Sequence, residues 1–379
     1  MQSRYLQGLA LFIGTIIGVG VFTLPFAITH IGLFGGLSLL GLLAVAMLVV
    51  HLMYGDAIVA TPGRHHLPVY AERYLGRGWG SLATISNLVL LNGALLVYVL
   101  LGSQFLASLV QFIFPGFSLG ASLAIFFCIG AVIFFFDGIF STEIEELLTI
   151  LLILVLAIVI GWGMLRGHIT GIGPVVWGSP SLPYGAILFS LAGAVVLPRV
   201  YATLGTDHHA FRSLVIFGTL MPAILYGLFI VAVWAASPAG PSQEAILGMQ
   251  PLLGRWVVAL GATVGFLATI TSYIGVGLTY KSLLQFDFRL SRLLAWAFVT
   301  AVPFLLVAAG FANFITIIGF VGAISIGFDN IVIIRLWHAL PEHKFLALWP
   351  RWGSVVLVVV FVVGMVAAML EFLRIIIIL

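Results

Sequence analysis

Two short clusters of small and hydroxyl-bearing residues are the parts of this sequence best suited to bind a ligand. Residues 14–25 combine three glycines with two threonines, residues 189–198 combine a serine with a glycine, and each cluster ends on a Leu-Pro pair. A cluster of this kind that interrupts a helix frees backbone N–H and C=O groups. Helix N-termini suit a carboxylate and freed carbonyl groups suit a cation. The chemistry expected here is therefore the binding of a charged small molecule.

The elements that carry these clusters are apolar segments of membrane length. Hydrophobic residues make up 63% of the chain, charged residues only 7%, and the mean hydropathy is +1.27, whereas soluble domains carry about 25% charged residues. The strands of a membrane β-barrel have about ten residues that alternate between apolar and polar. The long unbroken apolar runs of this sequence therefore exclude a β-barrel. The sequence therefore predicts an all-α integral membrane protein, one transmembrane domain over residues 1–379. Its eleven predicted membrane segments are 5–29, 34–59, 80–113, 118–138, 144–165, 182–204, 212–236, 254–284, 290–310, 313–337 and 353–378.

The distribution of basic residues predicts the orientation of these segments. With the amino terminus in the cytoplasm, twelve of the 15 Lys and Arg residues fall on the inner side, and only Arg166, Arg255 and Arg374 fall outside. Cytoplasmic loops are enriched in Lys and Arg, so we expect a multi-pass protein of the cytoplasmic membrane with its amino terminus inside. Residues 68–75 predict a short amphipathic cytoplasmic helix that begins with Pro68. No concentrated basic face is present that would predict a nucleic-acid partner.

The two clusters occupy corresponding places in the two halves of the chain. Pro25 and Pro198 lie about half the chain apart, and four segments lie between the first and the sixth, so the sixth segment enters the membrane from the side opposite to the first. Discontinuous helices in an inverted repeat show this pattern. The alternative is that the glycines only allow close helix packing, since Gly14 and Gly18 form a GxxxG motif.

The run Gly-Thr-Ile-Ile-Gly-Val-Gly at 14–20, followed by Leu24-Pro25, resembles the first-helix signature of the aromatic and hydroxy amino acid permeases. These belong to the amino acid/polyamine/organocation superfamily, alongside the sodium-coupled neutral amino acid transporters. Residues 271–278 and the loop at 71–76 resemble the same family. The resemblance implies the leucine-transporter fold. In that fold, five helices are repeated in inverted orientation (about 5–166 and 182–337), helices 1 and 6 are discontinuous, and residues 353–378 form an extra helix here.

The resemblance also implies a cation site between the first helix and the eighth. Carried over residue by residue, its ligands for Na⁺ are the carbonyl groups of Gly14, Ile17 and Ala268 and the hydroxyl groups of Thr271 and Ser272. Hard monovalent cations prefer oxygen ligands. The alternative is that both hydroxyls bond carbonyl groups one turn back. H⁺ is the rival coupling ion, although residues 147–165 of segment five lack the lysine that some relatives use.

The substrate would lie between the two breaks. Resemblance and geometry together place it against Thr15, Gly18 and Gly20 of helix one and Phe189, Ser190 and Gly193 of helix six. Tyr98 of segment three could donate its hydroxyl to the substrate carboxylate or could equally be a packing residue, and Thr269 of segment eight could face the same space. The absence of an acidic residue at either break favours a zwitterionic amino acid over a polyamine. A neutral and an aromatic side chain remain equally open, and no cofactor is expected beyond the coupling ion.

Charged residues near the inner ends predict a gate. Arg199 follows Pro198 in the second half of segment six, and we expect it to pair with Glu143 or Glu146 at the start of segment five. The alternative is that Arg199 extends to the membrane interface. Asp329 and Asn330 in segment ten form either a proton-linked site or a packing pair.

These patterns together predict a secondary active transporter that works by alternating access, a symporter of a small neutral or aromatic L-amino acid with Na⁺. The alternatives are a proton-coupled permease and a non-transporting amino acid sensor of the same fold. The sequence contains no HExxH motif, paired acidic motif or Ser/Lys dyad of a membrane enzyme. It also has no repeated selectivity filter of a channel.

Overall fold

The structure, a computed structural model of the 379-residue chain, describes residues 2–61, 63, 65–136, 142–168, 180–205, 207–286 and 288–378. Within these ranges every regular element is a helix, which agrees with the all-α prediction. The helices that match the predicted segments are α1 (Gln2–Ile16) with α2 (Gly20–Ala27), α3 (Gly32–Ala60), α5 (Arg77–Ile113), α6 (Leu119–Phe136), α7 (Thr142–Arg166), α8 (Ser181–Ser190) with α9 (Leu197–Leu204), α10 (His208–Ala236), α12 (Arg255–Phe286), α13 (Arg292–Ala308), α14 (Phe314–Val321) with α15 (Gly327–His338), and α16 (Arg351–Ile378).

The structure supports nine or ten membrane spans where the sequence predicted eleven. Nine helical segments of the described chain are long and apolar enough to cross a membrane, and α1 with α2, which meet at a bend of 44°, form a tenth. The predicted segment 290–310 differs, because its helix α13 has only 17 residues. At 1.5 Å per residue this helix is about 26 Å long, shorter than the hydrocarbon core of about 30 Å.

Both small-residue clusters interrupt a helix. Residues 17–19 separate α1 from α2, and an irregular turn followed by the 3₁₀ helix η2 (Ala194–Val196) separates α8 from α9. Pro198 lies in the first turn of α9, where a helix tolerates a residue without an N–H group. The breaks therefore lie where the sequence predicted them, and the inverted-repeat relation between the two halves remains a prediction.

Helix α10 runs beside the broken helix and contacts it at three levels. Gly218 has no side chain, so α1 packs directly against α10 there. At the break, the Tyr226 hydroxyl lies 2.6 Å from the carbonyl oxygen of Ile16, and beyond it Trp234 Nε1 donates to Pro25 O at 3.0 Å. Helix α10 thus contacts α1, the break and α2, and so fixes the position of α2 relative to α1.

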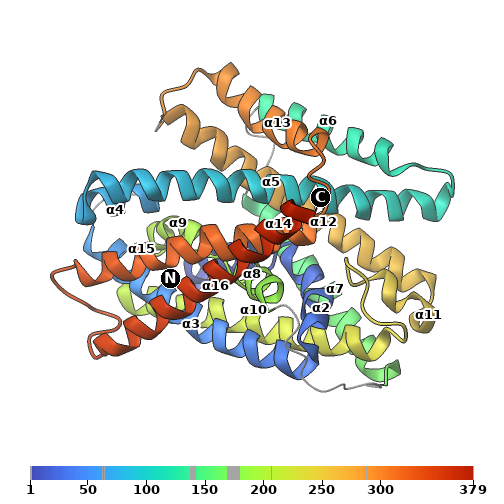
Figure 1. The fold of residues 1–379 in the computed structure, drawn as a ribbon, viewed down its shortest axis with the longest axis horizontal. Helices are drawn as coiled ribbons and strands as arrows, with labels where there is room; N and C mark the ends of the chain where they lie inside the picture. Colours follow the sequence, from blue (N-terminus) through green and yellow to red (C-terminus); the bar gives the residue numbers. More distant parts are fainter. Residues whose placement is uncertain are drawn as a thin grey trace.

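Two short helices mark the two ends of the bundle. Figure 1 shows α5 running through the middle of the molecule, with α6 and α13 along one side and α3 and α10 along the other. Helix α4 (Leu67–Leu75), which has Pro68 in its first turn as predicted, lies at one end, and α11 (Gln250–Leu253) lies at the opposite end (Figure 1). The predicted cytoplasmic helix and the loop between α10 and α12 are therefore on opposite faces.

A buried carboxylate fixes the loop between α15 and α16. Asp56 of α3 accepts hydrogen bonds from Trp337 Nε1 at 2.9 Å and from the backbone N–H groups of Lys344 and Phe345 at 2.9 and 2.8 Å. Its side chain is buried, so these three donors replace the water that the carboxylate would otherwise bind. The contact joins α3 to the carboxy-terminal helices at the α4 end of the bundle.

Candidate functional site

A cavity of about 250 Å³ lies where the two breaks face each other. Residues from both breaks and from α5, α7 and α12 form its walls, and His66 and Arg199 line it toward the α4 end of the bundle. Beyond the opposite side of the first break, the rings of Phe22, Phe105 and Phe229 are buried, with centroids 5.1 and 5.9 Å from that of Phe22. The cavity therefore extends toward the predicted cytoplasmic side, and a packed aromatic layer covers the other side.

Glycines let the first break approach two serine side chains. A Cβ atom at Gly20 would lie 3.0 Å from the Cα of Ser190, so α2 reaches the end of α8 this closely only with a glycine there. Gly18 is less crowded, because a Cβ atom there would lie 3.4 Å from Ser272 Oγ on α12. All four residues line the cavity. The unwound backbone is therefore in contact with α8 on one side and α12 on the other.

The carbonyl groups that end α1 and α8 meet at one tyrosine hydroxyl. Tyr226 Oη lies 2.6 Å from Ile16 O and 3.0 Å from Ser190 O. Ile16 and Ser190 line the cavity, whereas the fully buried Tyr226 lies behind them. The C-terminal end of a helix carries a partial negative charge. Two such ends at one place give the cavity wall a negative potential that suits a cationic group.

Hydroxyl groups of α5 and α12 form the opposite wall. The Tyr98 hydroxyl hydrogen-bonds the side chain of Ser272. Thr271 Oγ1 donates to the carbonyl oxygens of Leu267 at 2.9 Å and Ala268 at 3.0 Å. Thr271 thus adopts the bonding to the preceding turn that the sequence left open as an alternative. A hydroxyl that donates its proton keeps acceptor lone pairs, so this arrangement is compatible with a bound cation.

Most of the predicted site residues line this one cavity: Gly14, Thr15, Gly18, Gly20, Tyr98, Phe189, Ser190, Arg199, Thr271 and Ser272. Ile17 and Ala268 are buried next to these residues and do not line it, and Gly193 lines a smaller cavity instead. The side chains of Glu143 and Glu146 lie outside the described residues, so their pairing with Arg199 stays a prediction.

The structure does not place Thr269 in the cavity, contrary to the prediction. This residue is fully buried, and its hydroxyl donates to Gly265 O at 2.6 Å. Its methyl group faces α5, where it lies 2.9 Å from the position of a Cβ atom on Gly102. Positions two apart on an α-helix differ by about 200° in direction. Thr269 therefore points away from the wall that Thr271 lines.

Sequence reasoning missed three polar residues that line the cavity, Thr149, His66 and Thr279. A Cβ atom at Gly14 would collide with Thr149 Oγ1, so α1 packs directly on this threonine of α7. An isolated threonine in an apolar segment was the available signal for Thr149. His66 lies in a loop, and Tyr226, one of ten tyrosines, gave no signal in the sequence.

A smaller cavity of about 70 Å³ lies next to the central one and contains an acid. Asp329 and Asn330 line it together with Gly193, and His66 lines both cavities. The Ser86 hydroxyl donates to Ser325 O at 3.1 Å, and Asn330 Nδ2 donates to Met47 Sδ at 3.2 Å. Asp329 thus lies behind the second break and outside the central cavity.

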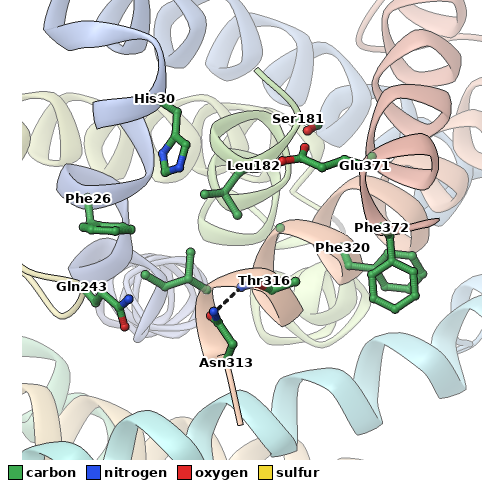
Figure 2. A pocket seen from close by; sticks show the side chains of 13 residues that line it. Phe26, His30, Ser181, Leu182, Gln243, Asn313, Thr316, Phe320, Glu371 and Phe372 are labelled. Atoms are coloured by element: carbon green, nitrogen blue, oxygen red, sulfur yellow. Dashed lines mark hydrogen bonds between the residues drawn. The ribbon is translucent and has the colours of Figure 1, made fainter. Parts of the chain in front are cut away.

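A third cavity, of about 320 Å³, lies at the other end of the bundle, at the ends of α2 and α8 that are farther from the breaks (Figure 2). Asn313 there caps α14 by accepting from the N–H of Thr316 at 3.1 Å, and Glu371 of α16 points toward Ser181 (Figure 2). No residue of 14–20 or 189–193 is among the described residues that line it. The central cavity is therefore the candidate site, although it is smaller than this third cavity.

The central cavity can bind a ligand through neutral groups. Apart from Tyr98, the ionisable side chains among its described lining residues are His66 and Arg199, and both lie toward one end. Hydroxyl groups and helix termini supply the other polar contacts. Nowhere in the described ranges do three His, Cys, Asp or Glu residues group so that they could hold a metal ion. Neutral hydroxyl groups and helix termini of this kind suit the binding of a zwitterion.

A family model described as the tryptophan/tyrosine permease family matches residues 1–371. The matched range includes both breaks and every described residue that lines the central cavity. A comparison with curated proteins gives no match.

Proposed function

The chain belongs to the tryptophan/tyrosine permease family, and we propose that it carries an aromatic L-amino acid across the cytoplasmic membrane together with Na⁺. Membership agrees with the predicted resemblance to aromatic amino acid permeases and supports amino acid transport by a multi-pass membrane protein. The sequence alone left neutral and aromatic substrates equally open. The family favours the aromatic class, which the proposal adopts.

The observation that carries the proposal is that helix ends of opposite polarity meet in one cavity. Ile16 and Ser190, the last residues of α1 and α8, line it, and so does Gly20, the first residue of α2. Helix C-termini attract cations and helix N-termini attract anions. An amino acid zwitterion carries both charges. Its ammonium group suits the negative ends of α1 and α8, and its carboxylate suits the N-terminal end of α2 at Gly20 and the hydroxyl of Tyr98.

The rest of the cavity suits an apolar side chain of limited size. Its volume of about 250 Å³ is slightly below the range of about 300–1,000 Å³ that is usual for ligand pockets, so it fits one amino acid. The apolar residues that line it include Leu90, Leu91, Ala94, Phe189, Val276 and Ile326. An indole or phenol ring would bury its faces against these residues.

We assign Na⁺ to the wall between the first break and α12. Gly14, Thr271 and Ser272 line that wall, and Thr149 brings a further hydroxyl group next to Gly14. Neutral oxygen atoms suit a hard monovalent cation. The other two expected ligands, the carbonyl groups of Ile17 and Ala268, belong to buried residues beside it.

The proposed mechanism is alternating access in the leucine-transporter fold. The broken helices α1–α2 and α8–α9, with α3 and α10, would move against the remaining helices and open the cavity to one side at a time. A cation that fixes the first break against α12 would order the backbone groups that hold the substrate, and substrate would in turn raise the affinity for the cation. Arg199, which lines the cavity toward the predicted cytoplasmic side, is the proposed gate residue.

Binding of a panel of L-amino acids to purified protein, in sodium and in choline at matched ionic strength, tests this proposal. We expect tryptophan and tyrosine to bind more tightly than alanine or lysine, and to bind more tightly in sodium than in choline. Equal binding in both salts would overturn sodium coupling and favour the proton alternative, with Asp329 as the first residue to examine. Absence of binding in both salts would overturn the amino acid assignment.

A further inference from the structure

Asp329 is an acidic residue at membrane depth that no basic side chain neutralises within the described part of the chain. It lies in α15, inside the apolar span Phe314–His338. Its Oδ1 atom is buried and has no hydrogen-bond partner among the described residues, and the ion pair found there, between Arg77 and Glu72, does not involve it. A buried carboxylate without a partner is costly, and acids inside a membrane protein commonly mark the path of an ion. Asp329 in its ionised form therefore needs a cation.

Asp329 lines a cavity that has room for a cation and for oxygen ligands. Its volume is about 70 Å³, whereas one water-sized position needs only about 10–15 Å³. Tyr54, Asn87 and Asn330 line it as well. Asn330 donates through its amide nitrogen, to Met47 Sδ at 3.2 Å, so its amide oxygen remains an acceptor. Carboxylate, amide and hydroxyl oxygen atoms are the ligands that a hard cation prefers.

The second break forms another wall of this cavity. Residues 192–195, between α8 and the start of α9, line it. The N–H of Ala192 donates to Phe189 O and the N–H of Val196 donates to Gly193 O, both at 3.3 Å. No backbone N–H group of the described chain donates to Ala192 O. A carbonyl group at membrane depth without a donor needs another partner, so Ala192 has a carbonyl oxygen available to a cation.

Asp329 and the second break belong to elements that would move relative to each other in the proposed mechanism. Helices α8 and α9 are in the moving group, whereas α15 is in the group against which they move. Helix α15 directly follows η4 (Gly322–Ile326), a π-helical turn of the kind that is frequent at functional sites. A Cβ atom at Gly322 would collide with Gly185 O, so η4 packs directly on the backbone of α8. A cation held by both Asp329 and the second break would therefore join the two groups.

We propose that Asp329 and the second break bind a second Na⁺, so that each break is fixed by one cation. The carboxylate balances the charge, and Asn87, Asn330 and the Ala192 carbonyl group supply neutral oxygen atoms. This inference rests on the proposed sodium coupling and adds a second ion to it. Tryptophan binding then depends on sodium cooperatively, because each cation orders a different break beside the substrate.

The test counts the Na⁺ ions that the purified protein binds, by titration with radioactive sodium at constant pH and ionic strength. The wild type should bind two Na⁺ per chain. Asp329→Asn, which is nearly isosteric, and Ser272→Ala should each leave one at sodium concentrations that saturate the wild type. Asn87→Leu keeps the size of the side chain and removes its amide oxygen, so it should weaken the binding of one ion at least about 10-fold. It keeps the test valid where Asp329→Asn does not fold.

Glu371→Gln is the matched control, because Glu371 is also an acid of a membrane-spanning helix but lines the third cavity. It should bind two Na⁺ as the wild type does. Two ions bound with wild-type affinity in Asp329→Asn or Asn87→Leu, or an equal loss in the control, would overturn the second site and leave the proposed function intact. Asp329 would then be neutralised by a proton or by His66, which lines the same cavity.

A wild-type protein that binds a single Na⁺, which Ser272→Ala removes, would likewise overturn the second site alone. A wild-type protein that binds no Na⁺ would overturn both the second site and the proposed sodium coupling.

Discussion

Replacement of Gly20 by alanine should impair transport without unfolding the protein, because the new methyl group would enter the contact between α2 and α8. The ideal Cβ position lies 3.0 Å from both the Cα and the Cβ of Ser190, and closer to its Oγ. The hydroxyl group can rotate away, but Cα belongs to the backbone. The start of α2 must therefore move by about 0.5 Å to reach an ordinary carbon–carbon contact of about 3.5–4.0 Å.

Two opposing effects set the expected magnitude. Overpacking of this kind costs about 1–3 kcal/mol, whereas alanine in place of glycine in a helix gains up to about 1 kcal/mol. The net loss of stability should thus stay below about 3 kcal/mol. Both Gly20 and Ser190 line the cavity, so the displacement falls on the substrate site. If the strain acts fully on binding, tryptophan affinity should fall about 5- to 150-fold, which corresponds to about 1–3 kcal/mol.

A double-mutant cycle with Ser190→Gly isolates this contact. Equilibrium binding of labelled tryptophan is measured for the wild type, both single variants and the double variant, and thermal unfolding confirms that each is folded. The double variant should bind tryptophan more tightly than the Gly20→Ala variant, because two of the three close Ser190 atoms, Cβ and Oγ, are removed and only Cα remains. Gly41→Ala, on α3 with no atom within 4 Å of its Cβ position, is the control and should bind as the wild type does. Wild-type affinity in Gly20→Ala, or strictly additive losses in the cycle, would refute the reasoning.

Three further predictions concern the cation, the fold and the gate. Ser272→Ala should weaken the sodium dependence of tryptophan binding at least about 10-fold, because one expected oxygen ligand is removed; a sodium titration that matches the wild type would exclude this residue as a ligand. Asp56→Ala should lower the free energy of unfolding by about 2–5 kcal/mol, because three donors lose their acceptor; thermal unfolding that matches the wild type would contradict this. Arg199→Gln should make cysteines introduced along the cavity more reactive from the cytoplasmic side; unchanged labelling would remove Arg199 from the gate.

The sequence predicted the breaks because their causes are local. Glycine and hydroxyl residues followed by Leu-Pro pairs disfavour a continuous helix, and α1 ends at Ile16 and α8 at Ser190 as that pattern requires. Tyr98 was less predictable, because one aromatic residue among many was equally compatible with packing, and only the structure places it in the wall of the cavity. The start of α4 followed from Pro68.

The remaining features depend on contacts that sequence spacing does not report. Tyr226 is a buried aromatic residue in an apolar helix, and only the packing of α10 across both breaks distinguishes it from a core residue. Thr269 was placed in the cavity from its neighbours in sequence, but the turn of the helix directs it toward α5. Helix α13 is shorter than the predicted segment 290–310 by two residues at each end, since it begins at Arg292 and ends at Ala308.

Uptake of labelled tryptophan into proteoliposomes tests the central claim most directly. The purified protein is reconstituted, and an inward sodium gradient is imposed or omitted at constant pH and membrane potential. We predict that tryptophan accumulates inside above its external concentration only while the sodium gradient lasts, and that excess unlabelled tyrosine competes with this uptake. Tryptophan that binds to the protein without entering the vesicles would contradict the account and assign the chain to the sensors instead.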